Sequence, residues 1–260
     1  MSIAWPVLYA VLVWWFATGA ILYLDGLPRR TFPISLGAAT VVLVGALYGL
    51  SASAAQATVP GAFVAFTCAV AVWGWMELSF LTGLVTGPRT QACAAHCEGV
   101  RHAGHAIEAI LYHEFAIVAG AAAIVAATWR APNQVGIATF LVLWVMRSSA
   151  KLNLFLGVRN LGEAFLPEHL TYLRSFLRRR RMNPLFPVSV LFGTAVVALI
   201  AARMAAPGAT PFDVASGALV AALLALAVIE HGFMMLPLPT QALWSWGFRS
   251  RSASSSRPTV

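Results

Sequence analysis

Charged side chains are scarce in this chain of 260 residues, since only 10% are Asp, Glu, Lys or Arg while 60% are hydrophobic. The mean hydropathy is +0.79. This composition excludes an ordinary soluble domain and is typical of a polytopic membrane protein. The sequence also lacks P-loop, GxGxxG, GxSxG and HExxH motifs, so hydrolase, kinase and ATPase activities lose their usual support. It lacks the CxxCH motif of haem attachment and the inverted repeats that indicate a transporter.

Seven apolar runs are long enough to cross a hydrocarbon core of about 30 Å. They cover residues 4–23, 32–50, 61–86, 106–129, 134–156, 186–202 and 214–236. The first run lacks a basic n-region and a cleavage site, so we expect it to remain as an anchor. The sequence therefore predicts an all-α fold in which residues 1–248 form a single transmembrane domain. Residues 249–260 are expected to be a disordered cytoplasmic tail.

The basic residues alternate between the two sides of the predicted spans. If the N-terminus is periplasmic, most of the 17 Lys and Arg residues lie in cytoplasmic loops, and only Arg130 and Arg203 fall in outer loops. This pattern predicts a cytoplasmic C-terminus and a multi-pass protein of the bacterial cytoplasmic (inner) membrane. The net charge of +8 is then explained by topology and by contact with anionic lipid headgroups. We expect membrane lipids as partners and no nucleic acid.

Ionisable residues interrupt four of the apolar runs. They are Glu77, His113, Glu114, Arg147, Lys151, Glu230 and His231. At 1.5 Å of rise per residue, the predicted topology places all of them about 9 to 16 Å from the cytoplasmic face. Ionisable groups are costly in hydrocarbon and usually face the protein interior, where they mark functional sites. The sequence thus predicts one polar layer shared by four helices.

Several interpretations of this layer remain open. Glu and His are the ligands of non-haem iron and di-iron centres, although His113-Glu114 and Glu230-His231 are adjacent and diverge by about 100° on a helix. A histidine could instead ligate the magnesium of a bacteriochlorophyll. The two basic residues could pair with the carboxylates in a structural network, or steer an anionic group of a substrate. A proton or ion path is a further alternative.

A second group of potential ligands follows the third run. It consists of Cys93, His96, Cys97, His102 and His105. These are soft or borderline ligands on the reducing side of the membrane, where a disulfide is not expected. The CxxxC spacing is a weak metal signal by itself, so a bound metal and a flexible loop are both compatible with the sequence.

Several longer strings of residues resemble the photosynthetic complex assembly protein PuhE of purple and related phototrophic bacteria. They are residues 75–83 (WMELSFLTG), 86–89 (TGPR), 112–114 (YHE), 132–134 (PNQ), 147–158 (RSSAKLNLFLGV), 166–173 (LPEHLTYL), 182–187 (MNPLFP) and 230–231 (EH). The resemblance spans residues 73–246, and it is specific because long strings of unusual residues occur in order.

What the resemblance implies is a cytoplasmic-membrane protein that is needed for efficient assembly of the reaction centre with its light-harvesting antenna and is linked to bacteriochlorophyll supply. The first hypothesis is a non-catalytic assembly factor that acts in bacteriochlorophyll supply or insertion. Its partners would be reaction-centre and light-harvesting subunits or other assembly factors. Its ligand would be bacteriochlorophyll or a precursor. The alternative expectation is a membrane-embedded, metal-dependent oxidoreductase of bacteriochlorophyll or carotenoid metabolism. Iron would then be bound by residues of the polar layer, namely Glu77, His113, Glu114, Glu230 and His231.

Overall fold

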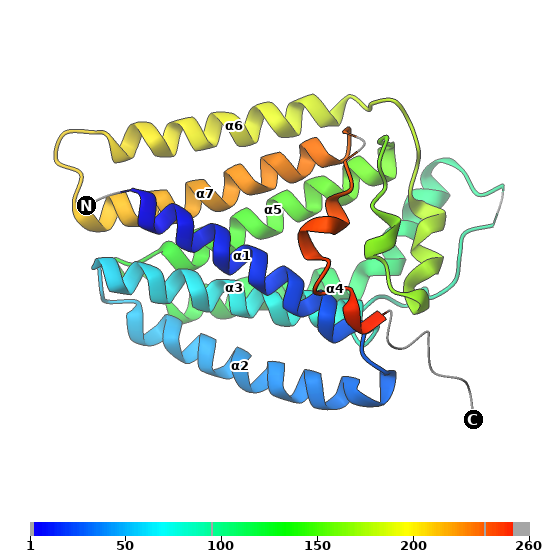
Figure 1. Ribbon diagram of the computed structural model, residues 1–260, viewed down its shortest axis with the longest axis horizontal. Helices are drawn as coiled ribbons and strands as arrows, with labels where there is room; N and C mark the ends of the chain where they lie inside the picture. The colour runs from blue at the N-terminus through cyan, green and yellow to red at the C-terminus, as the bar shows by residue number, and fades with distance from the viewer. Residues whose placement is uncertain (1–2, 95, 237, 252–260) are drawn as a thin grey trace.

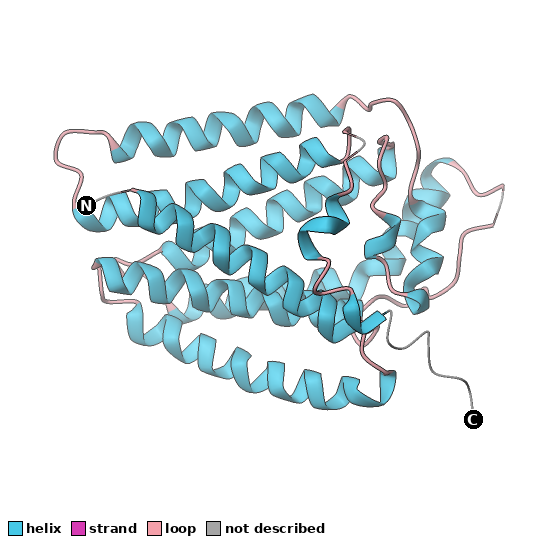
Figure 2. Cartoon of the chain, viewed as in Figure 1, coloured by secondary structure: helices cyan, strands magenta, loops and turns pink. Residues whose placement is uncertain are grey.

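The computed structural model describes residues 3–94, 96–236 and 238–251. Within these residues it confirms the all-helical fold, with seven helices long and apolar enough to cross a membrane. They are α1 (Ala4–Asp25), α2 (Phe32–Ser53), α3 (Val59–Leu81), α4 (Gly99–Ala127), α5 (Val135–Leu156), α6 (Leu185–Met204) and α7 (Pro211–Phe233). The helices run lengthwise through one bundle (Figure 1), and the described connections are loops and short helices (Figure 2).

Helix α3 forms the centre of the bundle and packs against α1, α2, α4, α5 and α7. Half of its most apolar window is buried, whereas the corresponding share is 11% for α2 and for α6. Small residues such as Ala62, Ala65 and Ala69 are buried on α3 and allow neighbouring helices to approach closely. Helices α2 and α6 lie at opposite sides of the bundle (Figure 1), where their apolar faces suit contact with lipid.

Two helix ends differ more than the others from the predicted boundaries. Helix α3 ends at Leu81 rather than at residue 86, because Gly83 adopts a φ of 80° and the amides of Leu84 and Val85 both donate to the Ser79 carbonyl. Helix α4 begins at Gly99 rather than at residue 106. Its 29 residues span about 44 Å, which exceeds the hydrocarbon thickness, so its polar first turns project beyond the apolar run.

Two connecting segments and the segment after α7 gather at the end of the bundle where α4 begins (Figure 1). We call this region the cap, and its described residues are 82–94, 96–98, 157–184, 234–236 and 238–251. The cap contains the short 3₁₀ helices η2 (Glu163–Phe165), η3 (Glu168–Phe176) and η4 (Thr240–Trp244). Buried residues of η3 recur at Leu170, Leu173 and Phe176, which is the three-residue period of a 3₁₀ helix, and they pack in a cluster with Phe80 and Leu81.

The cap also includes the first residues of the predicted tail. Arg251 binds Asp25 at the end of α1, with its Nη2 2.8 Å from Asp25 Oδ1, and Ser250 is buried. Residues 249–251 therefore belong to the folded part of the chain. The remainder of the predicted tail, residues 252–260, lies outside the described residues.

Candidate functional site

A cavity of about 580 Å³ lies between the helices and extends to the cap. Its walls come from α1, α3, α4, α5, α7 and the cap. Most of the lining is apolar, and it includes the aromatic side chains of Trp14, Trp73, Phe80, Phe155 and Trp244. The ionisable residues of the lining are Glu77, Arg147, Lys151, Glu230 and His231. An apolar pocket of this size with a few convergent polar groups is typical of a small-molecule site.

Glu77 of α3 and Arg147 of α5 form an ion pair on the cavity wall. Arg147 Nη2 lies 2.9 Å from Glu77 Oε2. The Arg147 side chain is 42% exposed, and the Glu77 side chain is only 10% exposed. A guanidinium has five N–H donors in a planar fork, so Arg147 can hold Glu77 and still present donors to an anionic group in the cavity.

Lys151 follows Arg147 by one helical turn, so both residues lie on one face of α5, and both line the cavity. Lys151 Nζ donates a 2.6 Å hydrogen bond to Glu114 Oε1 on α4. This second ion pair links α5 to α4, just as the first links α5 to α3. The polar layer therefore fixes the relative positions of three helices around the cavity.

His113 lies next to this ion-pair system but outside the cavity lining. Its side chain is fully buried, and neither ring nitrogen has a hydrogen-bond partner among the described residues. Its Nε2 is 3.9 Å from Glu77 Oε1, which exceeds hydrogen-bonding distance, and its ring centroid is 4.5 Å from that of Phe80. A ligand in the cavity would meet Glu77 rather than His113.

His231 lines the cavity, yet both of its ring nitrogens are engaged. Nδ1 is 2.8 Å from the Ala227 carbonyl oxygen, and Nε2 is 2.9 Å from Ser149 Oγ. Ser149 also donates to Ser189 Oγ on α6, so His231 ties α7 to α5 and α6. The adjacent Glu230 lines the cavity as well, with the Trp14 indole within hydrogen-bonding reach.

The side chains of the polar layer are not positioned to bind one iron ion together. Within the described residues, its carboxylates and imidazoles do not bring three ligand atoms within 4.8 Å of one another, whereas Cys93, Cys97 and His102 do. Two physical reasons explain this result. First, adjacent residues on a helix point in different directions. Second, Glu77 and Glu114 already form ion pairs with the two basic residues of α5. Most of the layer forms ion pairs and hydrogen bonds between helices.

The loop ligands separate into two groups. His105 Nδ1 lies 3.4 Å from Cys93 Sγ and 3.2 Å from Cys97 Sγ, and His102 Nδ1 lies 3.3 Å from Cys93 Sγ. His96 is exposed in the loop before α4. The structure thus brings together four of the five predicted loop ligands, with the two cysteines in the cap and the two histidines in the first turns of α4.

Two buried asparagines lie beside prolines in the segments that precede α5 and α6. Asn133 Nδ2 donates to the carbonyl oxygens of Ser53 and Gly61, and Asn183 Nδ2 donates to those of Asn153 and Gly157. The two residues anchor opposite ends of α5. Their positions beside Pro132 and Pro184 indicated turns, but they gave no sign of these long-range bonds.

His169 fastens the cap to α3. Its Nε2 lies 2.7 Å from the Leu81 carbonyl oxygen, and burial lowers the pKa of the imidazole below its ordinary value. A neutral ring whose Nε2–H donates to this carbonyl fits both observations. The ring also lies beside Phe32, with centroids 6.0 Å apart, so it joins the start of α2 to the same contact.

The chain matches the family described as "Protein of unknown function (DUF3623)" over residues 1–255. It is also 39% identical over 251 residues to a Rhodobacter capsulatus protein described as "Uncharacterized 30.4 kDa protein in puhA 5'region". That alignment covers 95% of this chain and 91% of the relative. No solved structure matches the chain.

Proposed function

This chain belongs to the DUF3623 family, and we propose that it binds a tetrapyrrole, bacteriochlorophyll or a precursor, during assembly of the photosynthetic reaction centre and its antenna. The place of the Rhodobacter capsulatus relative in the puhA 5' region supports a role linked to photosynthesis. The resemblance of residues 73–246 to the assembly protein PuhE supports the same role. The observation that carries the proposal is the cavity of about 580 Å³ in a membrane-spanning bundle.

The cavity suits a flat, mostly apolar ligand with an acidic edge. Aromatic walls such as Trp73, Phe80 and Phe155 offer faces and edges against which a macrocycle can pack. Arg147 and Lys151 offer positive charge on one wall, where a carboxylate or carbonyl substituent would be bound. A ligand of this kind is soluble in the membrane, and the bundle would shield it until it is transferred.

A carrier role fits the polar groups better than a catalytic one. The carboxylates of Glu77 and Glu114 are held by basic partners, and both ring nitrogens of His231 are engaged, by the Ser149 hydroxyl and the Ala227 carbonyl. Such groups fix helix packing and orient a ligand. Transfer of the ligand would then occur to reaction-centre or light-harvesting subunits, or to another assembly factor.

The proposed location is the bacterial cytoplasmic membrane, with the cap on the cytoplasmic side. Most of the basic residues belong to the cap or to the neighbouring α1–α2 turn, whereas Arg130 and Arg203 lie at the opposite end of the bundle. The positive-inside rule places the basic end in the cytoplasm. Fusions of a periplasmic reporter to the α4–α5 turn should be active, and fusions to the α5–α6 segment should be inactive; the reverse result would overturn this orientation.

The proposal is tested by purifying the full chain in mild detergent from a phototrophic host. The absorption spectrum and the mass spectrum of an organic extract would be measured against protein concentration. We expect a bound tetrapyrrole that co-elutes with the protein. Purified, folded protein with no tetrapyrrole would contradict the proposal, and stoichiometric iron in that sample would favour the oxidoreductase alternative.

A further inference from the structure

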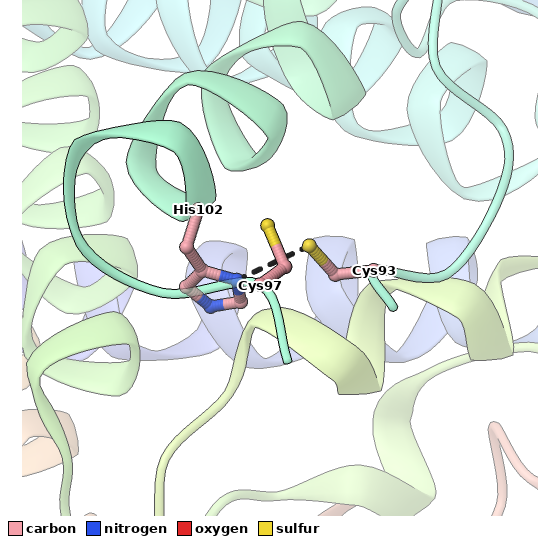
Figure 3. Close-up of side chains that lie close together, drawn as sticks. All are labelled: Cys93, Cys97 and His102. Atoms are coloured by element: carbon pink, nitrogen blue, oxygen red, sulfur yellow. Dashed lines mark hydrogen bonds between the residues drawn. The ribbon is translucent and has the colours of Figure 1, made fainter. Parts of the chain in front are cut away.

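Two cysteines and two histidines converge where the cap meets α4, outside the membrane-spanning part of the bundle. Figure 3 shows the Cys93 and Cys97 thiols facing each other beside the His102 ring. The ligand atoms of these three residues all lie within 4.8 Å of one another. His105 follows His102 by three residues on α4, which places both rings on one helix face, and its Nδ1 contacts both thiols.

The distances between these atoms suit a tetrahedral metal ion. Zinc bonds of about 2.3 Å to sulfur and 2.0–2.1 Å to nitrogen imply a separation of about 3.5 Å between a sulfur and a nitrogen ligand. The observed Sγ to Nδ1 separations are 3.2 Å for Cys97–His105, 3.3 Å for Cys93–His102 and 3.4 Å for Cys93–His105. His105 is not one of the three residues whose ligand atoms all lie within 4.8 Å of one another, so its ring must move toward His102 for all four residues to bind one ion. Small outward movements of the two thiols would then admit the ion.

The surroundings hold the ligands in place. His102 is buried, and its ring lies between those of Phe155 and Phe176, with both centroid distances 5.5 Å. The Cys93 amide donates a 2.9 Å hydrogen bond to Ser175 Oγ of η3. Outer contacts of this kind orient metal ligands. Arg89 and Arg101 also place positive charge near Cys97, which offsets part of the negative charge of two thiolates.

From this geometry we propose that Cys93, Cys97, His102 and His105 bind one zinc-class divalent ion. Two thiolates and two imidazoles are the ligand set of closed, four-coordinate structural zinc sites. The same set disfavours magnesium and calcium, which prefer oxygen ligands. This site goes beyond the proposed pigment function, and it involves none of the ionisable residues that line the cavity.

The ion would fasten the cap to the wall of the cavity. It would join the loop that carries both cysteines to the first turns of α4, and Cys93 is in turn bonded to η3. Ala103, Ala106 and Ile107 follow on α4 and line the cavity, as do Leu173 and Phe176 of η3. Metal binding is therefore expected to rigidify this end of the cavity rather than to take part in chemistry.

The direct test measures zinc in the full chain purified in detergent without chelators, using mass spectrometry of the metal. We expect about one zinc per chain, as for a closed structural site. Cys93→Ser and Cys97→Ser should lower the zinc content at least tenfold. His96→Ala and Cys68→Ser are the matched controls, because His96 is exposed in the same loop and Cys68 lies on α3, and both variants should retain zinc.

A second measurement uses the unaltered chain, so that a variant that fails to fold cannot decide the outcome. Cobalt loaded into the metal-depleted protein should give the intense sulfur-to-metal charge-transfer absorption of a thiolate site. Zinc should slow alkylation of Cys93 and Cys97 at least tenfold while leaving Cys68 unaffected. A wild-type protein that binds neither ion, or zinc that persists in the Cys93→Ser/Cys97→Ser variant, would overturn the proposal. Pigment content measured on the same samples reports separately on the proposed function.

Discussion

Arg147 on α5 and Glu77 on α3 are joined by a 2.9 Å hydrogen bond between Nη2 and Oε2, at the boundary between the cavity and the buried side of the bundle. The other carboxylate oxygen, Oε1, has no hydrogen-bond partner among the described residues and lies 3.9 Å from His113 Nε2. The pair therefore separates the cavity from an imidazole that has no hydrogen-bond partner of its own in the described part of the chain.

We expect Glu77→Ala to lower the free energy of unfolding by about 1–3 kcal/mol, because it leaves a guanidinium without its partner on the wall of a mostly apolar cavity. A double-mutant cycle with Arg147→Met, read by thermal unfolding in detergent, should show coupling between the two sites. The exposed pair Arg179–Glu163, at 3.5 Å, is the control and should couple by about 0–1 kcal/mol. Equal coupling in both cycles would contradict a stabilising role for the Glu77–Arg147 pair.

Asn183→Asp should destabilise the protein by about 3–5 kcal/mol, because it places a buried carboxylate without a compensating charge against carbonyl oxygens. Asn183 is 3% exposed, and its Nδ2 donates to Gly157 O at 2.9 Å and to two oxygens of Asn153. Its Oδ1 accepts from the first amides of α6, a contact that the aspartate would keep. The decrease in the free energy of unfolding would therefore come from the hydrogen bonds that Asn183 Nδ2 donates.

Gln134→Glu is the control for this substitution. The Gln134 side chain is exposed and also donates to two carbonyl oxygens, those of Thr128 and Ala131. Water can solvate the new carboxylate there, so we expect a change within about 1 kcal/mol. Similar melting temperatures for the two variants would show that the Asn183 contacts contribute little.

Arg251→Gln should lower the free energy of unfolding by about 3 kcal/mol or more, because Asp25 would lose a partner while its side chain stays fully buried. Arg251 contacts this carboxylate through Nε at 3.2 Å and through Nη2 at 2.8 Å. Arg249→Gln changes an exposed arginine of the same segment and should have an effect within about 0.5 kcal/mol. Asp25→Asn added to Arg251→Gln should restore part of the loss, and an absence of any rescue would argue against the pair.

The sequence predicted the helices well because their apolar runs are long and uninterrupted. It also predicted that the ionisable residues share one layer, because depth follows from counting along each helix. Pairing of the two basic residues with carboxylates was one open interpretation, but which carboxylate pairs with which base could not be predicted, since it depends on the rotation of each helix about its axis. The cavity itself depends on the distances between helices, which leave no pattern in a single sequence.

The potential metal ligands near the cap also could not be sorted from the sequence alone. Five residues were equally plausible ligands from the sequence, and the start of α4 decides among them. Because α4 begins at Gly99, His102 and His105 fall on one helix face toward the cysteines, while His96 stays in the loop. The predicted start at residue 106 would have left all three histidines in the loop.

The central claim is that the cavity binds a tetrapyrrole, and matched glycine substitutions test it most directly. Gly74 lines the cavity, and a side chain there would have its nearest contact, Ile21 Cδ1, 3.9 Å from the new Cβ. Gly45 lies on an exposed face of α2 with nothing within 4 Å of an added Cβ. Both positions therefore have room for a Cβ, and only position 74 belongs to the cavity lining, so we expect a Phe there to take up cavity space.

The measurement is titration of bacteriochlorophyllide into the purified wild-type, Gly74→Phe and Gly45→Phe proteins, followed by absorption, with melting temperatures recorded for all three. We predict that wild type and Gly45→Phe bind equally and that Gly74→Phe binds at least tenfold more weakly while remaining folded. Equal binding by a folded Gly74→Phe protein would contradict the account, because the ligand would then lie outside the cavity.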